Sequence, residues 1–287
     1  MKSFLFLIIA IVISITLTSG VQKNSGDINV TLQASGKNVS PVLLKQSEEI
    51  ISARLKVFGL NSTVVKTKAD KGEILITLPA KTDLSKIEGL LTSKGELSFY
   101  ETYTHAEILD MFKPGDQLLR LLSGGLDKIS PADPRVGCTN DDNKIKTEEY
   151  LRTAAPVNNS KLLWGNMSEK SGYCLFALKT NQDGKPLMVR SDIESVKISA
   201  GNNPEDLKIQ IKLNSSAAKV FADATEKDMN KSIAIVIDDQ VYAWPIVKSA
   251  IKNGEIEVTG SFTKNEVNYL PAVFNSPQLP LDFKLLK

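Results

Sequence analysis

The last quarter of the chain constrains its fold most strongly, because strand and turn signals follow one another there without interruption. Ile233–Ile237 is a continuous run of apolar, mostly β-branched residues, which is typical of a buried strand. Residues 238–240 (Asp-Asp-Gln) favour a tight turn, Val241–Trp244 resumes the strand pattern, and Pro245 ends the pairing. The pattern therefore predicts two antiparallel strands joined by a short turn.

A further strand and a helix follow this hairpin. Glu255–Thr259 alternates between polar and apolar residues, and Gly260 interrupts the alternation. Pro271 lies inside the helix that follows, where an interior proline costs about 3 kcal/mol, so we expect a kink or an early stop there. Thr263 is a suitable N-cap for this helix, whose apolar face carries Val267, Leu270 and Phe274.

The first hundred residues mix strand and helix signals in a recognisable order. A helix begins at Pro41 and ends at Gly59, and a second helix has Asp83 as its N-cap. The order strand, helix, strand, strand, helix, strand predicts an α+β fold. It is a ferredoxin-like βαββαβ unit with an antiparallel sheet and both helices on one face. The predicted strands are Ile28–Leu32, Thr63–Lys68, Glu73–Leu78 and Leu97–Thr102.

The region between residues 104 and 203 gives weaker signals. Residues 131–144 contain two prolines, one glycine and several Asn and Asp residues, which is the composition of a loop. Beyond this region, Leu207–Leu213 alternates as a strand and Asn214–Ser216 begins another helix. The middle of the chain is therefore predicted to be the least regular part.

A set of residues near both ends of the chain carries a family resemblance. The C-terminal block begins with an apolar strand that ends in Asp, and a Val, a Pro and a Gly follow it at intervals. The block continues with the sequence Thr-Gly-x-Phe-Thr, then a helix, and it ends with Leu-Pro. The N-terminal block has Arg-Leu in a helix, a glycine stop and a strand ending in Leu-Pro. These residues are Arg54, Leu55, Gly59, Leu78, Pro79, Asp238, Val241, Pro245, Gly254, Gly260, Phe262, Thr263, Leu279 and Pro280.

The arrangement closely resembles the first periplasmic domain of SecD, an accessory subunit of the bacterial protein-export translocase. A weaker block, Leu162–Gly165 with Leu175–Lys179, resembles the head region of some fused SecD-SecF proteins. The resemblance implies a base built from both ends of the chain and an inserted α+β head subdomain. Residues 26–104 correspond to the N-terminal half of the base, 105–250 to the head and 251–287 to the part that completes the base.

The resemblance also implies a function without catalysis. It predicts an extracytoplasmic domain that binds translocating polypeptide, as an unfolded or emerging chain, or a component of the Sec translocase. The alternative is an envelope protein-binding or scaffold module that keeps the SecD-like fold without an export role. An enzyme is a third hypothesis.

The sequence departs from the family pattern at Pro271 and in three other places. No second apolar run of transmembrane length follows the N-terminal one, so we expect a stand-alone chain without the transmembrane bundle, unable to couple proton flow by itself. Asp239 stands where the family usually has glycine, and a positive φ there would carry a small steric cost. Residues 276–278 (Ser-Pro-Gln) replace the glycine-containing turn that usually precedes Leu-Pro.

The N-terminus has the layout of a signal peptide. Lys2 precedes an apolar run from Phe4 to Leu17, and small residues follow up to Gly20. This run is shorter than the roughly 20 residues that span a bilayer, so we predict a signal peptide over residues 1–20 with cleavage near Gly20. The alternative is a retained inner-membrane anchor formed by residues 4–20, as in SecD. Both alternatives predict that the chain is exported to the periplasm. Any association with the membrane would then use this N-terminal segment alone.

Charge and residue types argue against most chemical functions. The 35 basic and 33 acidic residues, a formal net charge of +2, form no long runs and give no signature of nucleic-acid binding. His105 is the one histidine, so a catalytic triad or dyad would have to use it. The sequence also contains no nucleophile motif and no phosphate-binding loop. The pairs Asp141-Asp142 and Asp238-Asp239 lack the ligand series of a calcium loop, and one His with two distant Cys falls short of a zinc site. We therefore predict no catalytic residue, no metal and no cofactor.

Two cysteines and two tryptophans leave alternatives open. Cys138 and Cys174 form an even pair in a chain predicted to be exported, where thiols tend to oxidise. A disulfide between them would contribute roughly 3 to 4 kcal/mol, and the alternative is two buried free thiols. Trp164 and Trp244 fit core packing, although an exposed aromatic at Trp244 could grip apolar segments of an unfolded chain.

Overall fold

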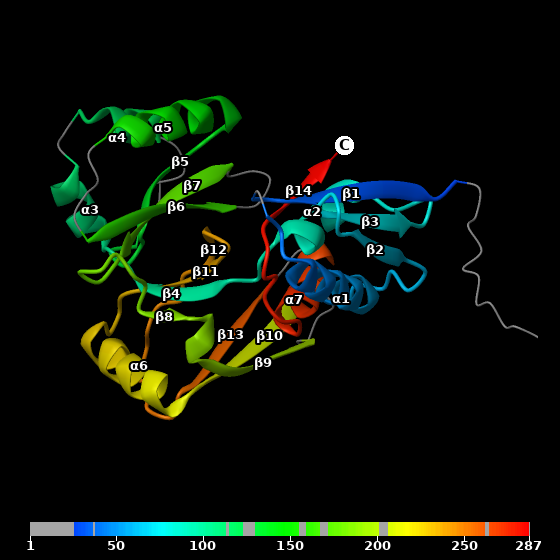
Figure 1. Cartoon of the computed structure of the whole chain (residues 1–287). Helices are drawn as coiled ribbons and strands as arrows, with labels where there is room; N and C mark the ends of the chain where they lie inside the picture. The colour runs from blue at the N-terminus through cyan, green and yellow to red at the C-terminus, as the bar shows by residue number, and fades with distance from the viewer. Residues whose placement is uncertain are drawn as a thin grey trace, which may run out of the picture.

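The computed structural model describes residues 26–36, 38–112, 115–122, 130–154, 159–166, 172–200, 206–261 and 264–286 (Figure 1). The predicted signal segment at residues 1–20 lies outside these ranges, as do Phe262 and Thr263. Within these ranges the chain forms three sheets with helices packed against them, which is an α+β fold. No helix in this part of the chain combines the length and the apolar composition that crossing a membrane requires.

The first sheet forms a ferredoxin-like base and confirms the predicted fold class. Its four strands are antiparallel and lie in the order β14-β1-β3-β2. Helices α1 and α2 pack their buried residues against the inward residues of this sheet in one apolar core. The elements of the base are β1 (Ile28–Ala34), α1 (Pro41–Val57), β2 (Val64–Lys68), β3 (Glu73–Leu78), α2 (Leu84–Thr92) and β14 (Phe283–Leu286).

The last strand of the base differs from the sequence prediction. The segment predicted as its sixth element forms β4 (Leu97–Glu101), which leaves the base and pairs with β11 (Ile233–Ile237). The first four residues of β4 are all buried, and a strand buried on both faces needs a central place in a covered sheet. The base sheet is therefore completed by β14, from the opposite end of the chain.

The second sheet has seven strands in the order β5-β7-β6-β12-β11-β4-β8. The hairpin predicted around residue 238 is confirmed as β11 and β12 (Gln240–Ala243). β6 joins β12 through a single parallel pair, Gly165 with Val241. The remaining strands are β5 (Arg135–Thr139), β6 (Ser160–Asn166), β7 (Tyr173–Lys179) and β8 (Met188–Val189).

Three helices cover β5 and β7 at the end of the molecule far from the base (Figure 1). The loop predicted for residues 131–144 is wrong, because this segment contains β5 and the start of α5. Val136 and Cys138 are buried against β7, and the side chain of Asn140 caps α5 by accepting from the N–H of Asn143. The helices are α3 (His105–Met111), α4 (Gln117–Leu121) and α5 (Asp141–Thr153).

The third sheet is small and antiparallel, with strand order β13-β10-β9. A 3-10 turn at Arg190–Asp192 leads from β8 into β9 (Ile193–Ala200). Helix α6 (Ser215–Lys227) follows β10 (Asp206–Leu213), and the strand predicted at residues 255–259 is β13 (Glu255–Ser261). The second and third sheets together are called the head below.

Helix α7 (Lys264–Phe274) connects the head to the base. Ala272 and Val273 pack in the core of the base, whereas Leu270 and Phe274 pack in the core of the head. The helix continues beyond Pro271, so the early stop is wrong; the kink stays a prediction. Burial of residues on both sides of Pro271 stabilises this turn of helix against the missing hydrogen bond.

Candidate functional site

An apolar pocket lies in the head between the two sheets. The space between its lining residues, which is partly open to solvent, measures about 410 Å³, and Leu270 and Phe274 of α7 are among those residues. β9, β10 and β13 supply one wall through Val196, Ile209, Ile211 and Val258, and β4, β11 and β12 supply the other. The alternation of β10 and β13 places the inward apolar residues here, while Lys212, Glu255 and Glu257 stay exposed.

The pocket is partly open to solvent. Val196, Ile209, Tyr242 and Ala243 line it and are only half-buried. Its lining side chains are aliphatic or aromatic, and among them Tyr242 is the one that carries a polar group. Such a site can remove apolar side chains from water, which is the driving force for binding hydrophobic segments.

Arg54 on α1 holds together the segments that join the base to the head. Its side chain is fully buried, and its guanidinium donates to five neutral oxygens. Burial lowers the pKa of Arg54 to about 10, so the side chain stays protonated at neutral pH. The acceptors are Ser276 Oγ at 2.8 Å and the carbonyls of Leu90, Ser93, Lys94 and Pro277 at 3.3, 2.5, 3.2 and 3.4 Å.

Asp238 lies in the turn between β11 and β12. From the head side it binds residues 93–96, the segment that connects α2 of the base to β4 of the head. One carboxylate oxygen accepts from the Ser93 hydroxyl and from the N–H of Gly95 at 3.2 Å, and the other accepts from the N–H of Glu96 at 2.8 Å. Asp238 and Asp239 have φ angles of 47° and 61°, as a tight hairpin turn requires. Asp239 pairs instead with Lys161 at 2.5 Å, so the adjacent carboxylates face different partners.

We call this cluster the base-head junction; it comprises Arg54, Ser93–Glu96, Asp238 and Ser276–Leu279. Two family-motif residues from distant parts of the chain therefore meet at one connecting segment. The N–H of Leu279 donates to the carbonyl of Lys94 at 3.0 Å and closes the cluster from the C-terminal side. Gly95 has a φ of 75°, and an added Cβ would lie 3.1 Å from the Arg54 guanidinium. The junction positions the head on the base.

The other motif residues lie at structural positions. Leu55 and Leu78 are buried in the base core, and Val241 is buried in the head. Gly59 follows the C-terminus of α1 with a φ of 102°, and a Cβ at Gly254 would lie 2.7 Å from Ala218. The remaining ones are Pro79 after β3, Pro245 after β12, Gly260 opposite Leu207 in β13, and Pro280 before β14.

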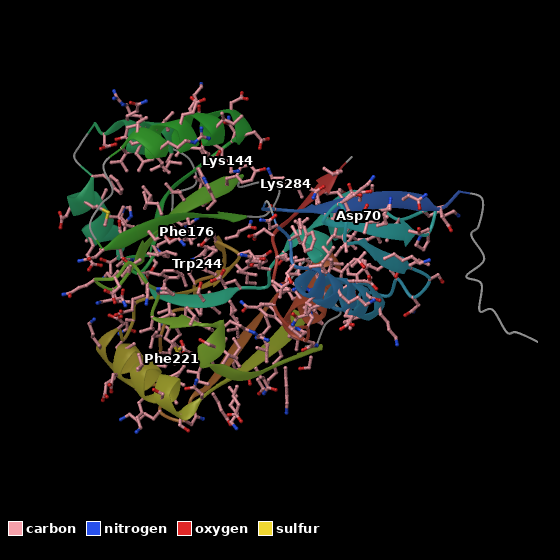
Figure 2. The ribbon with its side chains drawn as sticks, in the orientation of Figure 1. Asp70, Lys144, Phe176, Phe221, Trp244 and Lys284 are labelled. Carbon is pink, nitrogen blue, oxygen red and sulfur yellow. A yellow bond between two sulfur atoms is a disulfide. The ribbon has the colours of Figure 1, made fainter. Side chains whose placement is uncertain are left out.

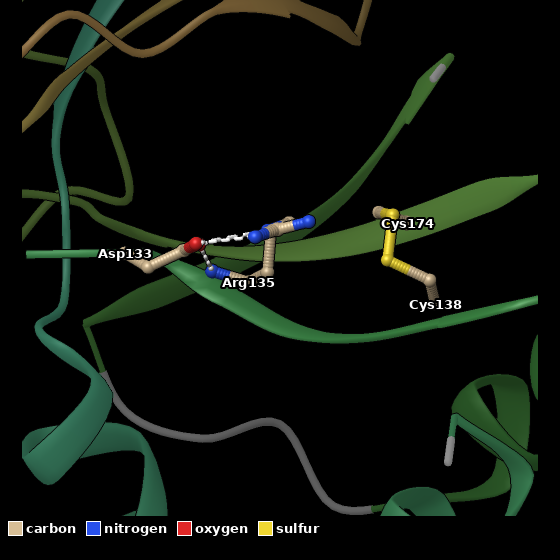
Figure 3. Close-up of a disulfide and its surroundings, with 4 residues drawn as sticks. All are labelled: Asp133, Arg135, Cys138 and Cys174. Carbon is tan, nitrogen blue, oxygen red and sulfur yellow. Dashed lines mark hydrogen bonds and ion pairs between the residues drawn. A yellow bond between two sulfur atoms is a disulfide. The ribbon is translucent and has the colours of Figure 1, made fainter. Parts of the chain in front are cut away.

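The predicted disulfide is confirmed: Cys138 on β5 and Cys174 on β7 are directly opposite one another and bonded (Figure 3). Both cysteines are buried. On the same segment, Arg135 forms an ion pair with Asp133 at 2.5 Å. The disulfide therefore ties β5 to β7, and the ion pair is local to the segment that begins β5.

Aromatic residues pack rather than stand free in this region. The rings of Trp244 and Phe176 lie 4.7 Å apart between centroids, and Trp244 packs against a buried cluster of the second sheet (Figure 2). Lys144 on α5 lies over the rings of Trp164 and Tyr173, at 5.7 and 4.7 Å from their centroids. His105 is the first residue of α3. In the described part of the chain, none of its hydrogen bonds joins it to another side chain that could act in catalysis.

Glu107 should make the attachment of α3 to β7 sensitive to acid. Burial disfavours its charge, but hydrogen bonds from Lys179 and Thr104 outweigh burial and lower the pKa of Glu107 to about 2. Its stabilising effect is therefore full above pH 4.5 and is lost as the pH falls through about 2. A carboxyl NMR titration should find this low pKa and its rise in a Lys179→Met variant. A Lys185→Met control should leave it unchanged, and an ordinary pKa in the wild type would refute the prediction.

Comparisons with known proteins agree on one family. Residues 176–281 match the family model described as SecDF, P1 head subdomain. The protein translocase subunit SecD of Calditerrivibrio nitroreducens is 25% identical over 274 residues, covering 94% of this chain and 45% of that protein. SecD of Syntrophobacter fumaroxidans is 23% identical over 266 residues, covering 91% and 42%. The chain thus spans about half the length of the curated relatives it matches.

Solved structures support the same fold. The crystal structure of SecDF in the super-membrane-facing form aligns with a TM-score of 0.53 and 17% identity, covering 91% of this chain and 30% of that one. A second structure, titled as a membrane component SecDF that enhances protein export, aligns with a TM-score of 0.50 and 16% identity, covering 91% and 98%. The described part of the chain therefore has the fold of SecDF periplasmic structures, a ferredoxin-like base that carries a head, and residues 176–281 match the SecDF P1 head subdomain.

Proposed function

We propose that this domain acts in protein export by binding apolar segments of translocating polypeptides in the pocket of its head. The observation that carries the proposal is this pocket, which is partly open to solvent and has a half-buried rim, and whose lining is apolar apart from the hydroxyl of Tyr242. An unfolded chain exposes apolar side chains that a folded protein buries, and such a pocket favours their transfer out of water. The relatives' names, protein translocase subunit SecD, support the link to export.

The same features support a role without catalysis. Among the lining residues, Tyr242 alone has a titratable side chain, and the others are aliphatic or phenylalanine. In the described part of the chain, no three His, Cys, Asp or Glu side chains gather closely enough to hold a metal ion. We infer that the domain works by binding alone, without a cofactor.

Location and partners follow from the same proposal. A disulfide between two buried cysteines fits an oxidising compartment, which supports export to the periplasm. We propose the Sec translocase components as partners beside the translocating chain. Residues 1–20 act as a signal peptide or residues 4–20 as an anchor, and the family-motif residues keep the structural roles described above.

A binding assay with one pocket variant and one surface variant tests the proposal. A Val196→Glu change places a carboxylate on the half-buried rim and should weaken binding of a fluorescent, permanently unfolded polypeptide at least tenfold. Val220→Glu on α6 makes the same chemical change at a side chain that is already 46% exposed, and should alter binding less than twofold. Equal affinities for both variants and wild type would remove the pocket from the proposal. Absence of binding, together with capture of another envelope protein, would favour the scaffold alternative.

A further inference from the structure

β9 is the outermost strand of the third sheet, and in the described part of the chain no strand lies on its other side (Figure 1). On its neighbour β10, the N–H of Leu213 donates to the carbonyl of Gly254, toward β13. The N–H and C=O groups of successive strand residues point to opposite sides, so Lys212 points toward β9. The same alternation directs every second residue of β10 toward β9.

This alternation shows which backbone groups of β9 point away from β10. The residues of β10 that point toward β9 are paired with Ser195, Lys197 and Ser199. The intervening residues Val196 and Ile198 therefore direct their N–H and C=O groups away from β10, to the open edge. Such an edge is a template for a further strand, and a peptide that adds to it gains main-chain hydrogen bonds.

The side chains of the same two residues face the interior of the head. Val196 lines the apolar pocket, and Val196 and Ile198 are both half-buried against the head core. In an antiparallel pair, residues directly opposite share one face of the sheet. A strand added beside β9 would therefore direct the residues opposite Val196 and Ile198 toward the pocket.

Lys197, between them, faces solvent and adds a charge preference. It is exposed, and the described residues form no ion pair with it, whereas its neighbours Lys208 and Lys212 pair with Glu257 and Glu194. An acidic residue opposite Lys197 would gain a favourable cross-strand pair.

We propose that β9 is a docking edge for extended segments of the translocating chain, which add as a fourth strand of the third sheet. The preferred segment has apolar residues two positions apart, opposite Val196 and Ile198, with an acidic residue between them opposite Lys197. The domain thus selects amphipathic, strand-forming segments over segments whose apolar residues have helical spacing. This inference rests on the proposed function and specifies which polypeptides the pocket receives.

Four fluorescent peptides test the docking edge on the wild-type domain. The first alternates valine and glutamate, the second has the same composition with valines at helical spacing, and the third is the first peptide N-methylated at its valines. N-methylation at the valines removes the N–H groups that would face β9, so the third peptide should bind at least tenfold more weakly than the first. A fourth peptide, N-methylated at the glutamates, is the matched control and should bind within about twofold of the first, since those N–H groups face away.

A charge reversal on the protein provides an independent readout. Lys197→Glu should reverse the preference between the glutamate peptide and one with lysine in its place by about fivefold. Lys219→Glu, the same change on an exposed part of α6, should not. Equal affinity for the alternating and helically spaced peptides, or equal effects of the two methylation patterns, would overturn the docking edge. If Val196→Glu still weakened binding in that case, the pocket would stand; if no peptide bound at all, the proposed function would fail as well.

Discussion

Replacing Arg54 with methionine should lower the free energy of unfolding by about 3 to 5 kcal/mol. Methionine fills much of the same space but donates no hydrogen bond. The carbonyls that Arg54 binds, including those of Ser93 and Lys94, would then be left without this donor inside the base-head junction. Buried acceptors without partners are costly, and several are affected at once. Urea unfolding at neutral pH measures the change.

Two controls separate the junction from a general effect of losing an arginine. Arg152→Met removes an exposed arginine from the last turn of α5 and should change stability by less than 1 kcal/mol. Arg54→Lys keeps the charge but cannot reach all five oxygens, so it should fall between wild type and Arg54→Met. A loss below 1 kcal/mol for Arg54→Met would show that the junction does not stabilise the domain.

Removing the disulfide is the second change with a large expected effect. A Cys138→Ala, Cys174→Ala variant should lose roughly 3 to 4 kcal/mol of unfolding free energy, because the unfolded chain regains a loop of 36 residues. The comparison is urea unfolding of the oxidised wild type and of the double variant. A reducing agent should destabilise the wild type by a similar amount and leave the variant unchanged. Equal stability of the oxidised wild type and the variant would contradict the prediction.

Elements with local signals could be predicted from the sequence. Helix α1, with Pro41 at its start and Gly59 after its end, is present as predicted, and so is the β11-β12 hairpin. Their signals lie within about twenty residues of one another, where capping, turn chemistry and periodicity act. The ferredoxin-like order followed from the same local patterns.

Long-range pairing was harder to predict. β4 carries the strand signal that suggested the sixth element of the base, but its burial on both faces sends it to the seven-stranded sheet. β14 pairs with β1 across almost the whole chain, and a strand of four residues such as Phe283–Leu286 gives little local signal for its partner. Strand partners are chosen by burial and packing more than by the strand's own sequence.

The pocket could not be predicted from the sequence because its walls come from distant segments. Leu97, Val196, Ile235 and Leu270 meet only after the two sheets of the head and α7 are assembled. The one available signal was the alternation of residues 207–213 and 255–259, which predicted strands with one apolar face. Which apolar face remains partly uncovered depends on tertiary packing. The base-head junction likewise appears only when Arg54 and Asp238 meet at Ser93–Glu96.

Site-specific photocrosslinking in the native envelope tests the central claim most directly. The full chain would carry a benzophenone side chain in place of Tyr242, on the half-buried rim of the pocket, or in place of Val220 on α6 as a control. During export of a pulse-labelled polypeptide, the Tyr242 position should crosslink that polypeptide, and the crosslink should disappear once export is complete. The Val220 position should give no such product. If the Tyr242 position crosslinks no exported polypeptide, or both positions crosslink it equally, the pocket does not receive translocating chains.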